Sequence, residues 1–130
     1  MAGGISVIGD VYKTQAYALC EYINQQAGKE IIPLNIITKA PSAELRPNQK
    51  DSDSLPEYLD LDTILYQYIE CRQGPNEIIA MGFNSDLVHR ILQMVNRNEY
   101  KRNQFCPIIR VSVNSFGVGR RVPIVAKYLG

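Results

Sequence analysis

Apolar residues recur at the spacing of a helix face in three stretches of this chain, and this pattern constrains its fold more than any other feature. Residues three and four apart lie on one side of a helix, so each stretch predicts one buried stripe. The stretches run from about residue 11 to 26, from 60 or 61 to about 72, and from 84 or 85 to about 97. The predicted stripes are Ala16, Leu19, Cys20 and Ile23; Leu61, Ile64, Leu65, Tyr68 and Ile69; and Leu87, Val88, Ile91, Leu92 and Val95.

The residues at the ends of these stretches are typical of helix boundaries. Asp10 is expected to cap the first helix, and Asn84 or Ser85 the third. Gly28 suits the position just past a helix end, where a left-handed conformation is common. Residues 76–81 predict one or two further helical turns.

Strand-like sequence is scarce. Residues 1–10 read as a loop or a short strand, and residues 31–37, interrupted by Pro33, as a short extended piece or an irregular buried stretch. Only residues 108–113 alternate like a strand, with Ile109, Val111 and Val113 on one side. The predicted fold is therefore mostly helical around one modest core, and strand content is too low for a complete α/β domain.

Length and composition exclude several classes of protein. A chain of 130 residues fits one compact domain or part of a larger one, and its longest apolar runs are too short to span a bilayer. Residues 1–11 lack the basic start of a secretory signal. Three widely spaced cysteines, Cys20, Cys71 and Cys106, favour neither a disulfide framework nor a zinc site. A reducing, cytoplasmic setting is expected.

Charge is distributed unevenly along the chain. Residues 1–70 hold 5 Lys and Arg against 10 Asp and Glu, whereas residues 71–130 hold 9 against 3. The basic half could face a nucleotide, a nucleic acid or the acidic half of the same molecule. Residues 76–97 also have the outline of a helix-turn-helix, although Asp86 would face phosphates at the start of its second helix. A small helical nucleic-acid-binding module is therefore the alternative function.

A long polar segment separates the first two predicted helices. Residues 38–56 contain three prolines and form a predicted loop of 19 residues. Loops of that length in a compact domain are usually functional lids or linkers.

Motifs for common chemistries are weak when taken one at a time. The glycines at 4 and 9 have the spacing of a phosphate loop, but Asp10 and Val11 stand where its Lys and Ser or Thr should follow. His89 is the only histidine, and no motif supplies it with a nucleophile or an orienting carboxylate. Lys13 lies close to the predicted start of a helix, where phosphate is attracted, although a solvated surface lysine is the simpler interpretation.

Three ordered motifs together are more specific. They are Gly-Gly-Ile-Ser-Val-Ile-Gly-Asp-Val-Tyr-Lys-Thr-Gln at 3–15, Ile-Thr-Lys-Ala-Pro-Ser-Ala-Glu-Leu-Arg-Pro at 37–47 with Gln-Lys-Asp-Ser-Asp-Ser-Leu-Pro at 49–56, and Tyr-Lys-Arg-Asn-Gln at 100–104 with Phe-Gly-x-x-Arg-Arg-x-Pro-Ile at 116–124. Over nearly its whole length, the chain resembles the C-terminal portion of the synthetase domain of NAD synthetases, most closely the glutamine-dependent type.

This resemblance implies an amide-forming ligase. Such enzymes use ATP and Mg²⁺ to adenylate the nicotinate carboxylate of deamido-NAD, and ammonia then displaces AMP. The implied fold is an α/β adenine-nucleotide α-hydrolase-like (Rossmann-like) domain, usually dimeric, of which this chain is the C-terminal part. A separate glutaminase domain supplies ammonia in the glutamine-dependent members. Neither a membrane nor a nucleic acid is an implied partner.

Residue roles follow from the matched motif positions. Lys13 is implied to contact ATP, and Ser42 to lie at the ATP phosphates and the metal. Residues 38–55 match the mobile loop that closes over the site. Tyr100 and Lys101 match the pair that binds deamido-NAD.

The chain departs from the family pattern in one large respect. No Ser-Gly-Gly-x-Asp-Ser pyrophosphate loop occurs in the 130 residues, and the first strands, an upstream acidic metal ligand and the glutaminase domain are absent as well. The expectation is a fragment of a longer polypeptide that does not turn over by itself.

Overall fold

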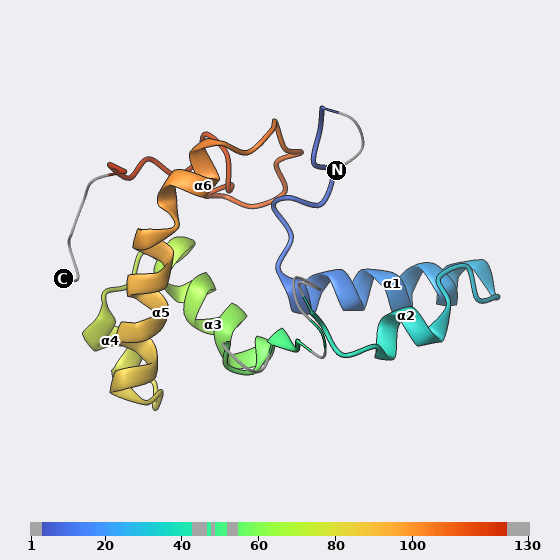
Figure 1. The fold of residues 1–130 in the computed structure, drawn as a ribbon, viewed down its shortest axis with the longest axis horizontal. Coiled ribbons are helices and arrows are strands. Elements are labelled where there is room, and N and C mark those ends of the chain that lie inside the picture. Colours follow the sequence, from blue (N-terminus) through green and yellow to red (C-terminus); the bar gives the residue numbers. More distant parts are fainter. Residues whose placement is uncertain (1–3, 43–46, 48, 52–54, 125–130) are drawn as a thin grey trace. The chain divides into compact units, whose positions relative to one another are not determined.

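The computed structural model describes residues 4–42, 47, 49–51 and 55–124. Its helices are α1 (Lys13–Ala27), α2 (Leu34–Thr38), α3 (Tyr58–Ile69), α4 (Pro75–Ala80), α5 (Ser85–Arg97) and α6 (Glu99–Asn103) (Figure 1). Strand-like pairing includes one parallel bridge, between Ser6 and Ile108. The expectation of a mostly helical chain is confirmed. No helix in the described part is long and apolar enough to cross a membrane.

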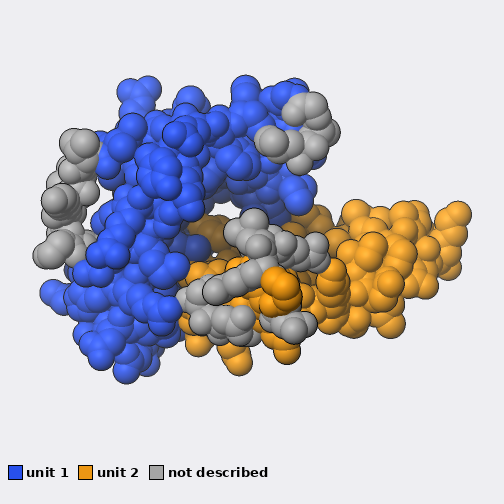
Figure 2. Space-filling view, viewed as in Figure 1, with its two compact units in different colours: residues 1–11, 63–130 blue, residues 12–62 orange. Residues whose placement is uncertain are grey.

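The chain divides into two compact units, coloured separately in Figure 2. One consists of residues 12–62 and the other of residues 1–11 together with 63–130.

In the unit of residues 12–62, α1 begins two residues later than a cap at Asp10 would require. Tyr12 is the N-cap residue, and its N–H donates to Gln15 Oε1 at 3.1 Å. The carboxylate at this helix start comes from Asp62, whose Oδ2 accepts the Thr14 N–H at 2.8 Å. The prediction of a cap at Asp10 is therefore wrong, because Asp10 is engaged elsewhere.

The C-terminal end of α1 matches its prediction, but its apolar face does not. Gly28 follows the helix with φ of 60°, a left-handed conformation that suits glycine. No α1 residue is buried, and Leu19 and Ile23 are 44% and 41% exposed. The predicted buried stripe is wrong for the described structure, in which Ala16 and Cys20 are only half-buried.

Residues 31–37 are not an extended piece. Pro33 is the N-cap of α2, a position where its missing N–H costs no helical hydrogen bond. The preceding turn is held by Asn24, whose Oδ1 accepts the N–H groups of Ile31 and Ile32 at 2.9 and 2.8 Å. This tertiary contact overrides the β-propensity of the isoleucines.

The other unit contains the described core. Its fully buried apolar side chains come from α3, α4 and α5 and are Ile64, Ile78, Val88, Ile91 and Leu92. Helices α4 and α5 pack as a hairpin, in which Gly82 takes φ of 101° and Asn84 Oδ1 accepts the Leu87 N–H at 3.1 Å. The predicted cap and much of the predicted stripe of α5 are confirmed.

The C-terminal region differs from its prediction in two ways. Helix α6 was not expected there. Residues 108–113 do not form a strand, and Val113 is 75% exposed. Only Ile108 pairs with another segment, at Ser6, and the N–H groups of Val111 and Ser112 donate to the Asp10 carboxylate instead of to a neighbouring strand.

Candidate functional site

Lys13 is the first residue of α1, and its side chain is exposed. The Nζ atom lies 5.3 Å from the ring centroid of Tyr17 and 5.9 Å from that of Tyr58. An ammonium at these distances from aromatic faces is stabilised by cation–π attraction and stays available to an anion from its open side. The two rings orient the charge without neutralising it.

The start of α1 is only partly available to an anion. Asp62 is buried and its carboxylate accepts the Thr14 N–H, so a negative charge of the protein already stands at this helix end. Phosphate binding here would therefore depend on the Lys13 ammonium more than on the helix amides.

The predicted lid is closed at its base within the same unit. The Asp51 N–H donates to the Pro41 carbonyl at 2.9 Å, and the Leu55 N–H donates to the Asp51 carbonyl at 2.8 Å. Tyr58 Oη donates to Asp51 Oδ2. Burial raises the pKa of Tyr58, and the Asp51 carboxylate raises it further, so the phenol stays a donor.

These contacts place Ser42 beside the closed base. It follows Pro41 directly and is half-buried, and Tyr58, which holds Asp51, is also the second ring next to Lys13. The predicted loop at 38–56 is confirmed in part. Thr38 ends α2 and Asp51 forms a short turn, whereas positions 43–46, 48 and 52–54 lie outside the described residues.

Tyr100 and Lys101 lie in the other unit, on α6, and both are exposed. Lys101 Nζ is 6.0 Å from the Tyr100 ring centroid, at the outer limit of cation–π contact. The four predicted site residues thus form two pairs, one in each unit.

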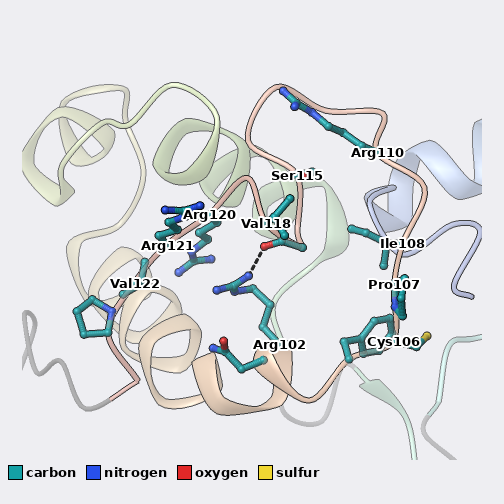
Figure 3. Close-up of a pocket in the computed structure, with 14 residues that line it drawn as sticks. Arg102, Cys106, Pro107, Ile108, Arg110, Ser115, Val118, Arg120, Arg121 and Val122 are labelled. Carbon is teal, nitrogen blue, oxygen red and sulfur yellow. Dashed lines mark hydrogen bonds between the residues drawn. The ribbon is translucent and has the colours of Figure 1, made fainter.

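A pocket of about 780 Å³ lies next to α6, and four arginines contribute to its wall: Arg102, Arg110, Arg120 and Arg121. In Figure 3, Arg110 lies apart from the other three and points away from them. Its guanidinium donates to the carbonyls of Ser112 and Val113 at 3.1 and 2.8 Å. A cationic pocket of this size suits an anionic ligand with several acceptor oxygens.

Arg102 connects two segments at this pocket, α6 and residues 116–117. Its Nε donates to Glu99 Oε1 at 2.9 Å, and its Nη1 donates to the carbonyls of Phe116 and Gly117 at 2.7 and 2.5 Å (Figure 3 draws one hydrogen bond of Arg102). Glu99 is 2% exposed and also lies 3.8 Å from Arg120 Nη2. One buried carboxylate therefore holds two of the pocket arginines.

The sequence interpretation assigned no role to Glu99, Arg102 or Arg120. The acid and base three residues apart at Glu99 and Arg102 are the signal that indicates a helical ion pair, but α6 itself was not predicted. The contact between Glu99 and Arg120 joins residues 21 positions apart, and no local sequence pattern indicates it.

Asp10 is a further residue whose role comes from tertiary structure. It is 9% exposed, and its two carboxylate oxygens accept the N–H groups of Val111, Ser112 and Phe116. Burial alone would raise the pKa of Asp10, but the hydrogen bonds from Ser112, Phe116 and Val111 outweigh it and lower this pKa below its ordinary value of 3.8. The carboxylate is therefore ionised at neutral pH.

Two other sequence expectations concern metals and His89. Among the described residues, no group of three or more His, Cys, Asp or Glu side chains is placed to hold a metal ion. His89 is exposed, and its Nδ1 lies 2.8 Å from the Ser85 carbonyl of its own helix. It is a surface helix residue, and nothing in its contacts indicates catalysis.

Comparison with known proteins gives a consistent family. The family model for NAD synthase matches residues 1–105 of this chain. The glutamine-dependent NAD(+) synthetase of Acinetobacter baylyi is 50% identical over 125 residues, which is 96% of this chain and 23% of that protein. The protein of the same name from Thermotoga maritima is 46% identical over 128 residues, covering 98% and 22% of the two chains.

A solved structure agrees with these matches. Glutamine-dependent NAD+ synthetase from Acinetobacter baumannii, in complex with adenosine diphosphate, is 40% identical with a TM-score of 0.54, over 89% of this chain and 19% of that one. The chain therefore spans less than a quarter of the length of these relatives.

Proposed function

Because this chain belongs to the NAD synthase family, we propose that it is the C-terminal part of the synthetase domain of a glutamine-dependent NAD synthetase. The observation that carries the proposal is the 50% identity to the Acinetobacter baylyi enzyme over nearly the whole chain. The parent domain would be Rossmann-like, with its sheet and its Ser-Gly-Gly-x-Asp-Ser pyrophosphate loop contributed by sequence outside these 130 residues. The comparisons give no support to the alternative of a nucleic-acid-binding module.

The proposed reaction joins ammonia to the nicotinate carboxylate of deamido-NAD. The carboxylate attacks the α-phosphate of ATP and releases pyrophosphate, and ammonia then attacks the acyl-adenylate carbon and releases AMP. Lys13 would stabilise the negative charge that develops on the phosphates, since its ammonium is exposed and oriented by two rings. The nucleotide role is supported by the adenosine diphosphate bound to the Acinetobacter baumannii relative.

The segment at 38–55 would act as the lid of this site. A lid that excludes water protects an acyl-adenylate from hydrolysis. Its base at Pro41 and Asp51 gives it fixed ends, and Ser42 at one end would reach the ATP phosphates through its hydroxyl.

Magnesium is implied by the family, and the described donor set does not by itself fit it. Mg²⁺ is usually held by one or two carboxylates together with substrate phosphates. Ser42 offers one neutral oxygen, and the described residues contain no acidic cluster for a metal. We therefore derive no step through the metal from this chain.

Deamido-NAD would bind in the other unit. Tyr100 supplies an aromatic face, Lys101 a positive charge, and the neighbouring pocket further cations for an anionic dinucleotide. A dimeric, cytoplasmic parent accompanies this proposal. Its support is the apolar surface that α1 leaves exposed, including Leu19 and Tyr22, and three cysteines that form no disulfide.

The test is enzymatic. The full-length protein that contains this chain is incubated with deamido-NAD, ATP, Mg²⁺ and glutamine, and NAD is measured by alcohol dehydrogenase-coupled absorbance. We expect equal amounts of NAD and AMP. If no NAD forms with glutamine and none forms with ammonia, the proposal is overturned. The 130-residue chain alone is assayed in parallel and is expected to form none.

A further inference from the structure

Residues 110–117 form a loop that is held from two sides by charged side chains. On one side, Asp10 Oδ2 accepts the N–H groups of Val111 and Ser112 at 2.9 and 2.8 Å, and Oδ1 accepts that of Phe116 at 2.6 Å. On the other side, Arg102 donates to the Phe116 carbonyl. Both peptide groups that flank the Phe116 Cα are therefore fixed by ionised side chains.

The segment of residues 6–10, which contains Asp10, packs against Pro107 and Ile108, just before this loop. Ser6 pairs with Ile108, and its N–H donates to the Pro107 carbonyl at 2.9 Å. A Cβ at Gly9 would lie 2.6 Å from Ile108 Cγ2, so only glycine allows this approach without a shift of the side chain. The close packing of Ser6 and Gly9 against Pro107 and Ile108 therefore places Asp10 next to the loop 110–117.

The held loop is also part of the wall of the arginine pocket. Arg110, Ser115 and Gly117 line it, whereas Asp10 does not. Phe116 lies between the lining residues Ser115 and Gly117 and donates its N–H to Asp10, so this part of the wall follows the backbone that Asp10 holds. A shift of this loop would move the wall of the pocket and leave Lys13, in the other unit, with its contacts to Tyr17 and Tyr58.

We propose that Asp10 is a positioning residue for the dinucleotide substrate, acting through the loop 110–117 that shapes the arginine pocket. This inference rests on the proposed function, which assigns the anionic dinucleotide to this unit. Asp10 does not touch the substrate, and its effect is on binding of deamido-NAD and not on binding of ATP.

The variants follow from the hydrogen bonds. Asp10→Asn replaces one acceptor oxygen by an NH₂ group, which then faces an N–H donor. Asp10→Glu keeps the charge and both acceptors but displaces them by one methylene. Asp86→Asn is the matched control, because Asp86 is an exposed acid on α5 of the same unit.

The experiment measures kcat and KM for deamido-NAD and for ATP in the full-length enzyme, at a temperature well below the melting temperature of each variant. We expect Asp10→Asn to raise KM for deamido-NAD by about tenfold or more, with KM for ATP within about twofold of the unmodified enzyme. Asp10→Glu should raise it less, and Asp86→Asn should leave both constants unchanged. Equal changes in the two KM values, or none, would overturn the inference.

Two further outcomes are decisive. If Asp10→Asn does not fold, the KM values of Asp10→Glu for deamido-NAD and for ATP decide the question. Loss of the fold in both variants would make Asp10 a structural residue and refute the inference. If the unmodified protein forms no NAD, the proposed function fails first. Calorimetric titration with deamido-NAD then decides for Asp10: weaker binding to Asp10→Asn upholds the inference, and equal or absent binding refutes it.

Discussion

The carboxylate of Asp10 accepts the backbone N–H of Phe116 at 2.6 Å, across 106 residues of sequence. Two further N–H groups, of Val111 and Ser112, share the same carboxylate. Hydrogen bonds to an ionised group contribute more to stability than neutral ones, so this contact joins the start of the chain firmly to its basic end.

The lowered pKa of Asp10 predicts how its contribution to stability depends on pH. A carboxylate whose pKa is lower in the folded state stabilises the fold above its unfolded value of 3.8, and this contribution is lost as pH falls through the folded pKa. The melting temperatures of the unmodified protein and Asp10→Asn should differ by a constant amount above about pH 5 and converge below about pH 4. A difference that grows on acidification would contradict the sign. Asp86→Asn, at an exposed position, supplies the reference for removal of a surface charge.

Because Glu99 is buried and paired with Arg102, we expect removal of its charge to lower the stability of the fold considerably. Glu99→Gln leaves the Arg102 guanidinium without its charged partner and weakens the contact to Arg120. Removing one member of a buried pair typically costs about 3 kcal/mol, seen as a lower midpoint in urea unfolding. Glu77→Gln, at an exposed acid on α4, is the control and should change the midpoint little. A midpoint for Glu99→Gln equal to that of the control would show that the pair contributes nothing.

Tyr58 is expected to stabilise the base of the predicted lid, where Asp51 is hydrogen-bonded to Pro41. Tyr58→Phe removes the donor to the Asp51 carboxylate, a hydrogen bond to a charged group worth about 1.5–3 kcal/mol. We expect faster amide hydrogen exchange at Asp51 and Leu55, together with a higher KM for ATP. Tyr22→Phe, at an exposed ring of α1, is the matched control. Unchanged exchange at Asp51 would mean that the loop is closed without Tyr58.

Lys13 and Ser42 are the residues through which the proposed nucleotide site is tested. Lys13→Gln and Ser42→Ala in the full-length enzyme should each lower kcat/KM for ATP by about tenfold or more. The melting temperature should change little for Lys13→Gln, since an exposed cation–π contact is worth about 0.5–1 kcal/mol. Lys29→Gln, just beyond the end of α1, controls for loss of a surface charge. Turnover that survives both changes would remove Lys13 and Ser42 from the site.

Lys101 gives the corresponding test on the dinucleotide side. Lys101→Gln should raise KM for deamido-NAD and leave KM for ATP unchanged, because its charge lies on α6 beside the Tyr100 ring. Arg97→Gln, an exposed cation in the last turn of α5, is the comparison. An equal rise in KM for both variants would indicate general electrostatic attraction in place of a defined contact.

Much of the helical structure could be predicted because its causes are local. The stripe of α5 repeats over 13 residues, and Asn84 and Gly82 mark its start within the sequence itself. The loop after α2 was indicated by its prolines. Three motifs were enough to identify the family, because each combines several residue types in fixed order.

Errors arose where a residue's partner is distant in sequence. Asp10 resembles a helix cap by its position, but the N–H groups that it accepts belong to residues 111–116, and Asp62 takes its place at α1. Residues 108–113 alternate like a strand, yet a strand needs a neighbour along its whole length, and Ile108 alone is paired.

The family and the helices with local caps follow from the amino-acid sequence alone, and Lys13, Ser42, Tyr100 and Lys101 are its predictions for the site. Two further relationships became visible only in the folded chain. The buried carboxylate of Glu99 binds Arg102 and lies close to Arg120, and Asp10 holds the loop 110–117. Helical hydrogen bonds and caps act over three or four residues, whereas a buried charge must be satisfied by whatever groups the fold brings to it.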